Sequence, residues 1–339
     1  TSQLTANYET QLGKHALQAL GGFSQENNTY RASQIRRIGI PGNDFGVISN
    51  GTTTDDNSTW GTGNEWSLSS FFGRVNYSWD ERYLLEANFR YDGSSRFAKE
   101  SRWGFFPSVS AGWRITREPA LAGLTRVFDE LKLRGSWGQL GNQNIGLYSY
   151  LGTVSQSTPA YSFGNNPATG AYFSVANRDI TWETSTMVNL GLDGSLLDGR
   201  LTFGLEYFDK KTSDILLNLP VPDVFGGGSP TQNAGVVQNR GYEVNLGWNQ
   251  STGSVAHTFN LNLADSKNKV LDLKGQYYIY GWDVNTLVKE GEPINSYFAF
   301  QSDGFFQNQA EVDRGPKPSF ASQVKPGDIR YKDQNGDGI

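Results

Sequence analysis

Apolar and polar residues alternate almost without error in two neighbouring segments, residues 69–79 and 83–92, which are joined by only three residues, 80–82. Successive side chains of a strand point to opposite faces, so this alternation predicts a β-hairpin with one apolar and one charged face. Each predicted strand has about ten residues, which is the length that a tilted strand needs to cross a bilayer. The hairpin therefore has the form expected of two neighbouring strands in an outer-membrane β-barrel.

The same one-sided alternation recurs along most of the chain and predicts ten strands. The predicted strands are residues 3–9, 15–25, 67–79, 82–92, 103–115, 130–138, 184–195, 200–212, 239–249 and 257–265. Beyond residue 269 the alternation weakens, and no strand is assigned there.

The connections between these strands alternate in length. Short turns are predicted near residues 10–14, 80–82, 197–200 and 250–256, and long, polar, Gly-rich loops at 26–66, 93–102, 140–183 and 213–239. Up-and-down transmembrane barrels have short turns on the periplasmic side and long loops outside. The connection 117–129 is the exception, because it is long on the short side, and Pro119 predicts a brief helix there.

An amphipathic strand is also compatible with half of a soluble β-sandwich, whose apolar face packs on a second sheet. Three features favour the membrane barrel instead. The strands exceed the usual five or six residues, the polar face carries full charges such as Arg74, Glu86 and Arg90, and Trp79 and Tyr83 lie at strand ends, where barrels carry aromatic girdles. The predicted fold class is all-β, an antiparallel transmembrane β-barrel.

Composition agrees with strands and membrane interfaces, since aromatic residues make up 13% of the 339 residues and nine Trp stand against one Met. The absence of Cys excludes disulfides and thiolate metal sites. A net charge of -5 gives no support to nucleic-acid binding. The sequence opens without a signal peptide and ends within a loop motif, so we expect residues 1–339 to be one barrel segment of a longer protein.

Several motifs give the chain a resemblance to a known family. They are residues 69–77 (SSFFGRVNY), 90–97 (RYDGSSRF), 103–114 (WGFFPSVSAGWR), 131–138 (LKLRGSWG), 141–143 (GNQ), 181–184 (TWET), 239–243 (NRGYE) and 326–333 (PGDIRYKD). In this order they resemble the SusC/RagA family of TonB-dependent transporters from Bacteroidetes. The resemblance covers nearly the whole chain.

That resemblance implies a barrel of about 22 strands with a plugged lumen, of which this chain forms roughly half. It implies an outer-membrane location and TonB-dependent import of oligosaccharides or peptides, together with a surface lipoprotein of the SusD type. The signal peptide, the plug that TonB acts on and the C-terminal strands are expected outside this sequence. No catalytic residue is expected, and the protein is not interpreted as an enzyme.

One motif has the form of a metal site. Asp333, Asn335 and Asp337, followed by Gly338, match the first half of an EF-hand-type calcium loop, with oxygen ligands at every second position. The bidentate acid expected at the twelfth position falls outside the sequence. The alternative interpretation is a surface turn of the Asn-Gly and Asp-Gly type.

Aromatic residues in the predicted loops form a second candidate site, for stacking on a sugar or a peptide. They are Trp60, Trp66, Tyr148, Tyr150, Tyr161, Phe163 and Tyr172. The alternative is that they pack within the loops or contact the lipoprotein.

Three other functions stay open on the sequence alone. They are a siderophore or cobalamin receptor of the same barrel class, a secreted carbohydrate-binding β-sandwich, and a surface hydrolase. A glycoside hydrolase needs two carboxyl groups about 5–10 Å apart, and the sequence selects no such pair.

Overall fold

The computed structural model describes the chain in nine segments, which are residues 1–40, 42, 47–54, 58–173, 176–219, 224, 229–281, 284–318 and 323–338. The chain divides into two compact units, Thr1–Lys274 and Gly275–Ile339. Each unit is described separately.

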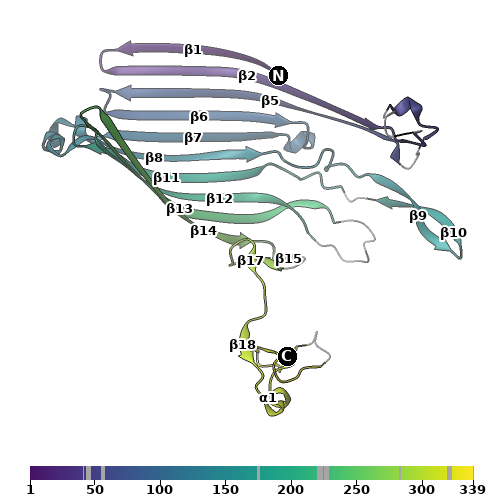
Figure 1. The fold of residues 1–339 in the computed structure, drawn as a ribbon. Helices are drawn as coiled ribbons and strands as arrows, with labels where there is room; N and C mark the ends of the chain where they lie inside the picture. Colours follow the sequence, from purple (N-terminus) through teal and green to yellow (C-terminus); the bar gives the residue numbers. More distant parts are fainter. Residues whose placement is uncertain are drawn as a thin grey trace. The chain divides into compact units, whose positions relative to one another are not determined.

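The first unit is built on one antiparallel sheet of ten strands, in which neighbours in the sheet follow one another along the chain (Figure 1). In spatial order these strands are β1 (Ser2–Leu12), β2 (His15–Gln34), β5 (Trp60–Trp79), β6 (Tyr83–Ser94), β7 (Trp103–Arg114), β8 (Phe128–Asn142), β11 (Glu183–Leu196), β12 (Leu201–Asn218), β13 (Thr231–Thr252) and β14 (Val255–Asp272). They coincide with the ten predicted strands, which are therefore confirmed. The sheet is open, with β1 and β14 at its edges, so the fold is part of a barrel.

Short turns and long loops lie at opposite ends of this sheet (Figure 1). Asp80 and Glu81 in the turn between β5 and β6 both have positive φ, 54° and 50°. Two consecutive residues of this kind give a turn whose twist matches that of the strands. Among the described residues of the long connections, β3 (Arg37–Ile38) pairs with β4 (Thr53–Thr54) and β9 (Val154–Phe163) with β10 (Asn166–Phe173). Short 3₁₀ helices there include η1 (Ile48–Asn50) and η3 (Lys99–Ser101).

The long connection between β7 and β8, at the turn end of the sheet, contains the helix that Pro119 predicts. It forms two 3₁₀ helices, η4 (Ile115–Arg117) and η5 (Pro119–Arg126), and Pro119 occupies the first turn of η5. Proline is favoured there because its missing N–H has no partner in a first turn. No helix in the described residues is long and apolar enough to cross a membrane.

Two predicted loops are wrong over part of their length. The predicted loop 213–239 is shorter, because β12 continues to Asn218 and β13 begins at Thr231. The predicted loop 26–66 differs more. Strands β2 and β5 continue beyond their neighbours as a two-stranded ribbon, from Asn27 opposite Ser67 to Gln34 opposite Trp60. Pairing with β1 stops at Gln25, and pairing with β6 stops at Leu68. The ribbon extends roughly 25 Å at about 3.4 Å per residue. One face of the ribbon is polar, and the other carries Tyr30, Trp60 and Trp66 among polar residues. The apolar positions are too few to give the regular alternation from which strands are predicted.

The register collects the apolar positions of the ten strands on one side, which we call the apolar face. One row runs across six strands through Leu85, Ala111, Gly135, Leu190, Tyr207 and Tyr242. These side chains are not covered by a second layer, since Leu190 is 57% exposed and Phe259 is 66% exposed. A β-sandwich would bury such residues between two sheets, and the ten strands belong to a single sheet.

Aromatic rows mark two levels of the apolar face. At the turn end, the Tyr83 ring stacks on Trp79 and Trp113, with centroids 5.4 and 6.4 Å apart. Towards the loop end, Trp103 stacks on Tyr91 at 4.8 Å. The distance from residue 83 to residue 91 is about 27 Å along the strand. With a tilt of about 40° it is roughly 20 Å in height, close to the apolar band of transmembrane barrels.

The second unit is small and contains short elements that the sequence did not predict. They are β15 (Tyr277–Tyr280), β16 (Thr286–Lys289), β17 (Ser296–Tyr297), β18 (Ser302–Phe305), α1 (Gln309–Arg314) and β19 (Ile329–Tyr331). Strands β15, β16 and β17 form one sheet, and β18 pairs with β19. The Asn308 side chain caps α1 by accepting a hydrogen bond from the backbone N–H of Glu311 at 3.0 Å.

Candidate functional site

The polar face of the ten-stranded sheet carries a cationic group shared between two acids. Arg134 of β8 donates from Nε to Asp193 Oδ2 at 2.9 Å, and its terminal nitrogen lies 2.7 Å from Glu206 Oε2 of β12. Gly191 of β11 lies between them, opposite both Arg134 and Glu206 in the register. A Cβ built on Gly191 would lie 2.5 Å from Arg134 Cζ. The absence of a side chain thus lets the guanidinium cross one strand to reach the next.

The Arg134 guanidinium holds the Asp193 and Glu206 carboxylates at defined positions on the polar face. The planar fork of arginine holds two carboxylates in a defined geometry. Glu243 of β13 lies directly opposite Glu206 in the register. Lys132 of β8 lies directly opposite Asp193. Three acidic and two basic side chains therefore lie near one another on the polar face of neighbouring strands.

The polar face contains several hollows, of which two are large. The one nearer the turns has a volume of about 390 Å³ and is lined by Gln18, Asn76, Leu84, Glu86, Ser110 and Lys132, among others. The central one has a volume of about 480 Å³, and its lining includes Asn88, Ser108, Ser136, Gly138, Asn189 and Lys210. Hydroxyl and amide groups both donate and accept hydrogen bonds. The lining therefore suits ligands that present hydroxyl or peptide groups.

Two adjacent small residues, Ser108 and Gly138, leave space for the central hollow. Asn88, Ser108, Gly138 and Met187 lie in one row across four strands. A Cβ on Gly138 would come within 2.8 Å of the Ser108 Cβ. Large side chains in this row would fill the space, so the hollow follows from the residue sizes in the row.

A buried cluster of five apolar residues, the loop-end cluster, closes the loop end of the polar face. Its members are Phe97, Phe106, Ile145, Ile180 and Trp182. The ring of Trp182 lies 5.1 Å from that of Phe97 and meets Phe106 edge-on at 5.3 Å. A Cβ on Gly141 would lie 1.9 Å from the Phe106 ring, so glycine is required where this ring crosses β8.

The loop-end cluster attaches two long loops to the sheet, because Phe97 belongs to the connection 95–102 and Ile145 to the connection 143–182. Two hydrogen bonds reinforce it. Trp182 Nε1 donates to the carbonyl of Arg102 at 3.0 Å, and Arg96 donates to the carbonyl of Ile145 at 2.5 Å. The sequence interpretation missed this cluster, although Phe97 and Trp182 stand in the motifs of the resemblance.

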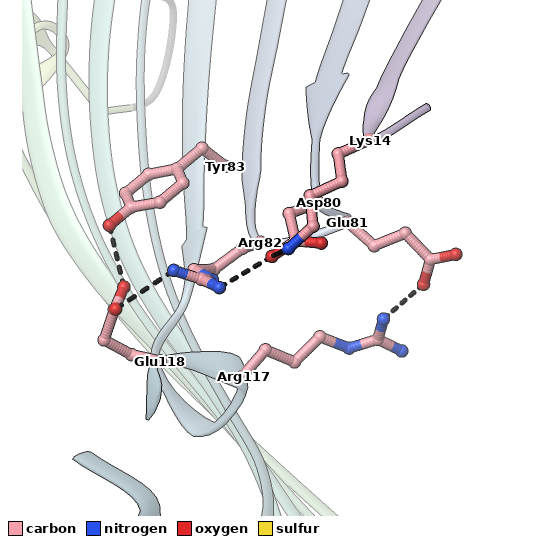
Figure 2. A network of polar contacts seen from close by, with 7 residues as sticks. All are labelled: Lys14, Asp80, Glu81, Arg82, Tyr83, Arg117 and Glu118. Atoms are coloured by element: carbon pink, nitrogen blue, oxygen red, sulfur yellow. Dashed lines mark hydrogen bonds and ion pairs between the residues drawn. The ribbon is translucent and has the colours of Figure 1, made fainter. Parts of the chain in front are cut away.

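Ionic contacts join three connections at the opposite end of the sheet and form the turn-end network. It consists of Lys14, Asp80, Glu81, Arg82, Tyr83, Arg117 and Glu118 (Figure 2). Arg82 bridges Asp80 and Glu118 at 2.6 and 3.1 Å, and Glu118 accepts from the Tyr83 hydroxyl at 2.7 Å. The hydrogen bond from Lys14, with the charges of Lys14 and Arg82, lowers the pKa of Asp80 below its usual value. The network therefore holds Asp80 ionised at neutral pH.

The proposed calcium loop lies in the second unit. Asp333 Oδ1 accepts from the backbone N–H of Gly336 at 2.6 Å, and its Oδ2 accepts from that of Gly338 at 2.8 Å. These bonds lower the pKa of Asp333. The Asn335 amide donates to Asp337 Oδ2 at 2.8 Å.

The calcium loop offers three side chains, whereas Ca²⁺ takes six to eight oxygen ligands. The donor set is chemically suitable but supplies only the first half of a coordination shell. In the described part of the chain, no group of three or more His, Cys, Asp or Glu side chains is placed to hold a metal ion. The bonds within the loop are also those of a polar surface turn.

Two of the candidate loop aromatics pack against the protein. The Arg96 guanidinium lies 5.2 Å from the centroid of the Trp66 ring, and the Tyr148 hydroxyl donates to the carbonyl of Glu65 at 3.4 Å. These contacts favour the packing alternative for both residues. The side chains of Tyr161 and Tyr172 lie outside the described residues.

Comparison with known proteins gives consistent matches. A family model described as TonB dependent receptor-like, beta-barrel, matches residues 1–318. The chain is 32% identical to TonB-dependent receptor P26 of Formosa agariphila, over 99% of this chain and 34% of that protein. It is 34% identical to TonB-dependent receptor SusC of Bacteroides thetaiotaomicron, over 80% of this chain and 27% of that protein.

A solved structure of the RagAB peptide transporter has a similar fold, with a TM-score of 0.77 and 26% identity over 97% of this chain and 36% of the matched chain. The outer membrane transporter YddB from Escherichia coli matches in fold alone, with a TM-score of 0.55 and 10% identity. The chain spans about a third of the length of the curated relatives that it matches.

Proposed function

Because the chain belongs to the TonB-dependent receptor β-barrel family, we propose that the complete protein imports oligosaccharides or peptides across the outer membrane. The chain is of the SusC/RagA type and is an outer-membrane protein. The observation that carries the proposal is the polar face, with its fixed charges and its hydroxyl-lined and amide-lined hollows. A water-filled or plugged lumen requires such a lining in a transmembrane barrel.

In this proposal the ten-stranded sheet forms part of the barrel wall that surrounds the transport path. Its apolar face is turned to lipid, and its polar face borders the path of the substrate. The Arg134 group fixes charge there, while the central hollow offers neutral hydrogen-bonding groups such as Asn88 and Ser136. Neutral donors and acceptors suit both sugar hydroxyls and peptide bonds. We infer no catalytic step for these residues.

Two protein partners belong to the proposal. A SusD-like surface lipoprotein would contact the loop end, where the loop-end cluster holds two long loops against the sheet. TonB would act through a part of the protein outside this chain. Support comes from the similarity to SusC and to the RagAB transporter.

The test uses the complete protein, purified with the SusD-like lipoprotein that the proposal assigns to it. Binding of a panel of oligosaccharides and of a peptide pool is measured by calorimetry, and uptake is compared in cells with and without TonB. We expect tight binding of one of these two classes and TonB-dependent uptake of it. Binding of a siderophore or cobalamin, with neither sugars nor peptides bound, would replace the proposal with that alternative.

The central hollow offers a variant for the same test. Replacing Ser136→Leu fills the hollow, whereas Ser195→Leu places the same side chain on the polar face of β11, away from the hollow. We expect weaker substrate binding or slower uptake only for the first. Equal effects of the two variants would show that the hollow is not part of the path.

We also propose that Asp333, Asn335 and Asp337 bind Ca²⁺ in the complete protein, with further oxygen ligands from outside this chain. The support is their spacing and the orientation of the Asp333 carboxylate. Terbium luminescence of the complete protein should fall with Asp333→Ala and not with Asp313→Ala in α1. Unchanged luminescence in both variants would identify the loop as a plain surface turn.

A further inference from the structure

A groove interrupts the apolar face near its turn end. Its volume is about 540 Å³. The floor consists of Ala111 and Gly135, which are neighbours on β7 and β8. Its rim includes larger side chains, namely Tyr77, Tyr83, Leu85, Trp113, Leu133 and Leu190. The groove is therefore an apolar depression in a surface that faces lipid.

Residue sizes within one row produce this groove. Leu85, Ala111, Gly135 and Leu190 are successive members of the row. A leucine thus stands on each side of two small residues. A straight hydrocarbon chain fits a depression of this form, because it gains contact with a floor and two walls at once.

The groove ends at the charged turn-end network. Tyr83 and Trp113 belong both to the rim and to the aromatic row at the membrane border. The Tyr83 hydroxyl donates to Glu118, and the Arg82 guanidinium lies 5.9 Å from the centroid of the Tyr83 ring. An apolar groove is thus continuous with charged groups of both signs. This polarity matches an amphipathic molecule standing in a bilayer.

We propose that the groove binds one acyl chain of a phospholipid whose zwitterionic headgroup contacts the turn-end network. The network contains three basic side chains and three acidic ones, Lys14, Arg82 and Arg117 with Asp80, Glu81 and Glu118. Lys14, Glu81 and Arg117 are its exposed members, with 67%, 72% and 43% of their side chains accessible. A phosphate and an ammonium group therefore both reach a partner of opposite charge. The groove opens on the face that already contacts lipid, so a phospholipid reaches it without any rearrangement of the sheet.

The test is native mass spectrometry of the complete protein in detergent. Phosphatidylethanolamine and phosphatidylglycerol are titrated separately into delipidated protein. Gly135→Leu fills the floor of the groove, and Ala87→Leu adds the same side chain to the same face outside it. We expect one tightly held phosphatidylethanolamine in the wild type and in Ala87→Leu. Gly135→Leu should lose this retained lipid, because the leucine removes the packing contacts with the floor that favour the groove over the surrounding detergent.

Several outcomes overturn the proposal. Equal retention of phosphatidylethanolamine in the wild type and Gly135→Leu would show that the groove is not occupied, and equal loss in both leucine variants would show a non-specific effect. Loss of an oligomer in Gly135→Leu without loss of lipid would assign the groove to a second copy of the chain. Preference for phosphatidylglycerol would contradict the headgroup assignment. If Gly135→Leu fails to fold, Ala111→Leu fills the same floor.

Discussion

Trp182 gives the most direct test of the loop-end cluster. Its side chain is 5% exposed, and it contacts two aromatic rings and one backbone carbonyl. Replacing a buried Trp by Ala removes this burial and leaves a cavity, at a cost of about 3–5 kcal/mol. The loops that carry Phe97 and Ile145 are attached to the sheet through this contact. We therefore expect Trp182→Ala to release the loops while the strands stay paired.

The assay is amide hydrogen exchange on the complete protein in detergent. If local opening is made easier by about 3–5 kcal/mol, exchange in the two loops should accelerate roughly 10²- to 10⁴-fold, since each 1.36 kcal/mol is a factor of ten. The amides of Phe97 and Ser101, which are hydrogen-bonded within the first loop, report it directly.

Trp137→Ala provides the matched control for Trp182→Ala. Trp137 is 38% exposed on the apolar face, so its loss should leave loop exchange unchanged. Unchanged loop exchange in Trp182→Ala, or acceleration of equal size in the control, would refute the assignment of the cluster as the attachment of the loops.

Three further predictions concern the sheet and its turns. Gly191→Ala should displace the Arg134 guanidinium and lower the free energy of unfolding by about 1 kcal/mol, a modest loss because the ion pair is partly solvated. Urea titration measures this loss. The control Gly204→Ala, whose nearest contact would be an ordinary one at 3.5 Å, should be nearly neutral. Val109→Arg, halfway between the aromatic rows, should cost about 2–4 kcal/mol in folding into vesicles, whereas Ser110→Arg on the polar face should be tolerated. The lowered pKa of Asp80 contributes stability that is complete above its unfolded value of 3.8 and disappears as pH falls through the lower folded value. The stability difference between wild type and Asp80→Asn should therefore be constant near neutral pH and decline only below pH 3.8.

The sheet could be predicted because its two faces meet different surroundings. Strands β6 and β7 alternate along most of their length, since one face meets lipid and the other meets a polar interior. Leu84 and Phe106 are the apolar exceptions on the polar face. The ribbon at residues 27–34 and 60–67 was not predicted, because its two faces do not differ as those of β6 and β7 do. Tyr30, Trp60 and Trp66 lie among polar residues on one of its faces, so the regular alternation that reveals a strand is missing there.

The contacts of the polar face depend on register, which the sequence pattern alone leaves open. Arg134 lies in a recognisable motif, but its partner Asp193 is 59 residues away. Only the pairing of β8 with β11 brings the two together. The loop-end cluster likewise joins segments that look like polar loops when each is considered alone, because its apolar residues are few and far apart in sequence.

The ribbon of β2 and β5 has a mechanical consequence. Up to Leu68 both strands pair with neighbouring strands, whereas from Asn27 to Gln34 each strand pairs only with the other. Loop side chains contact the ribbon near its base, where Arg96 lies over Trp66 and Tyr148 donates to the carbonyl of Glu65. A sideways load at the tip therefore bends the ribbon about its base, and a load that separates the strands opens their pairs one after another from Trp60 inward. The rigid ten-stranded sheet thus ends in a flexible two-stranded ribbon. A protein that binds the tip of this ribbon transmits force to the sheet at the base of the ribbon.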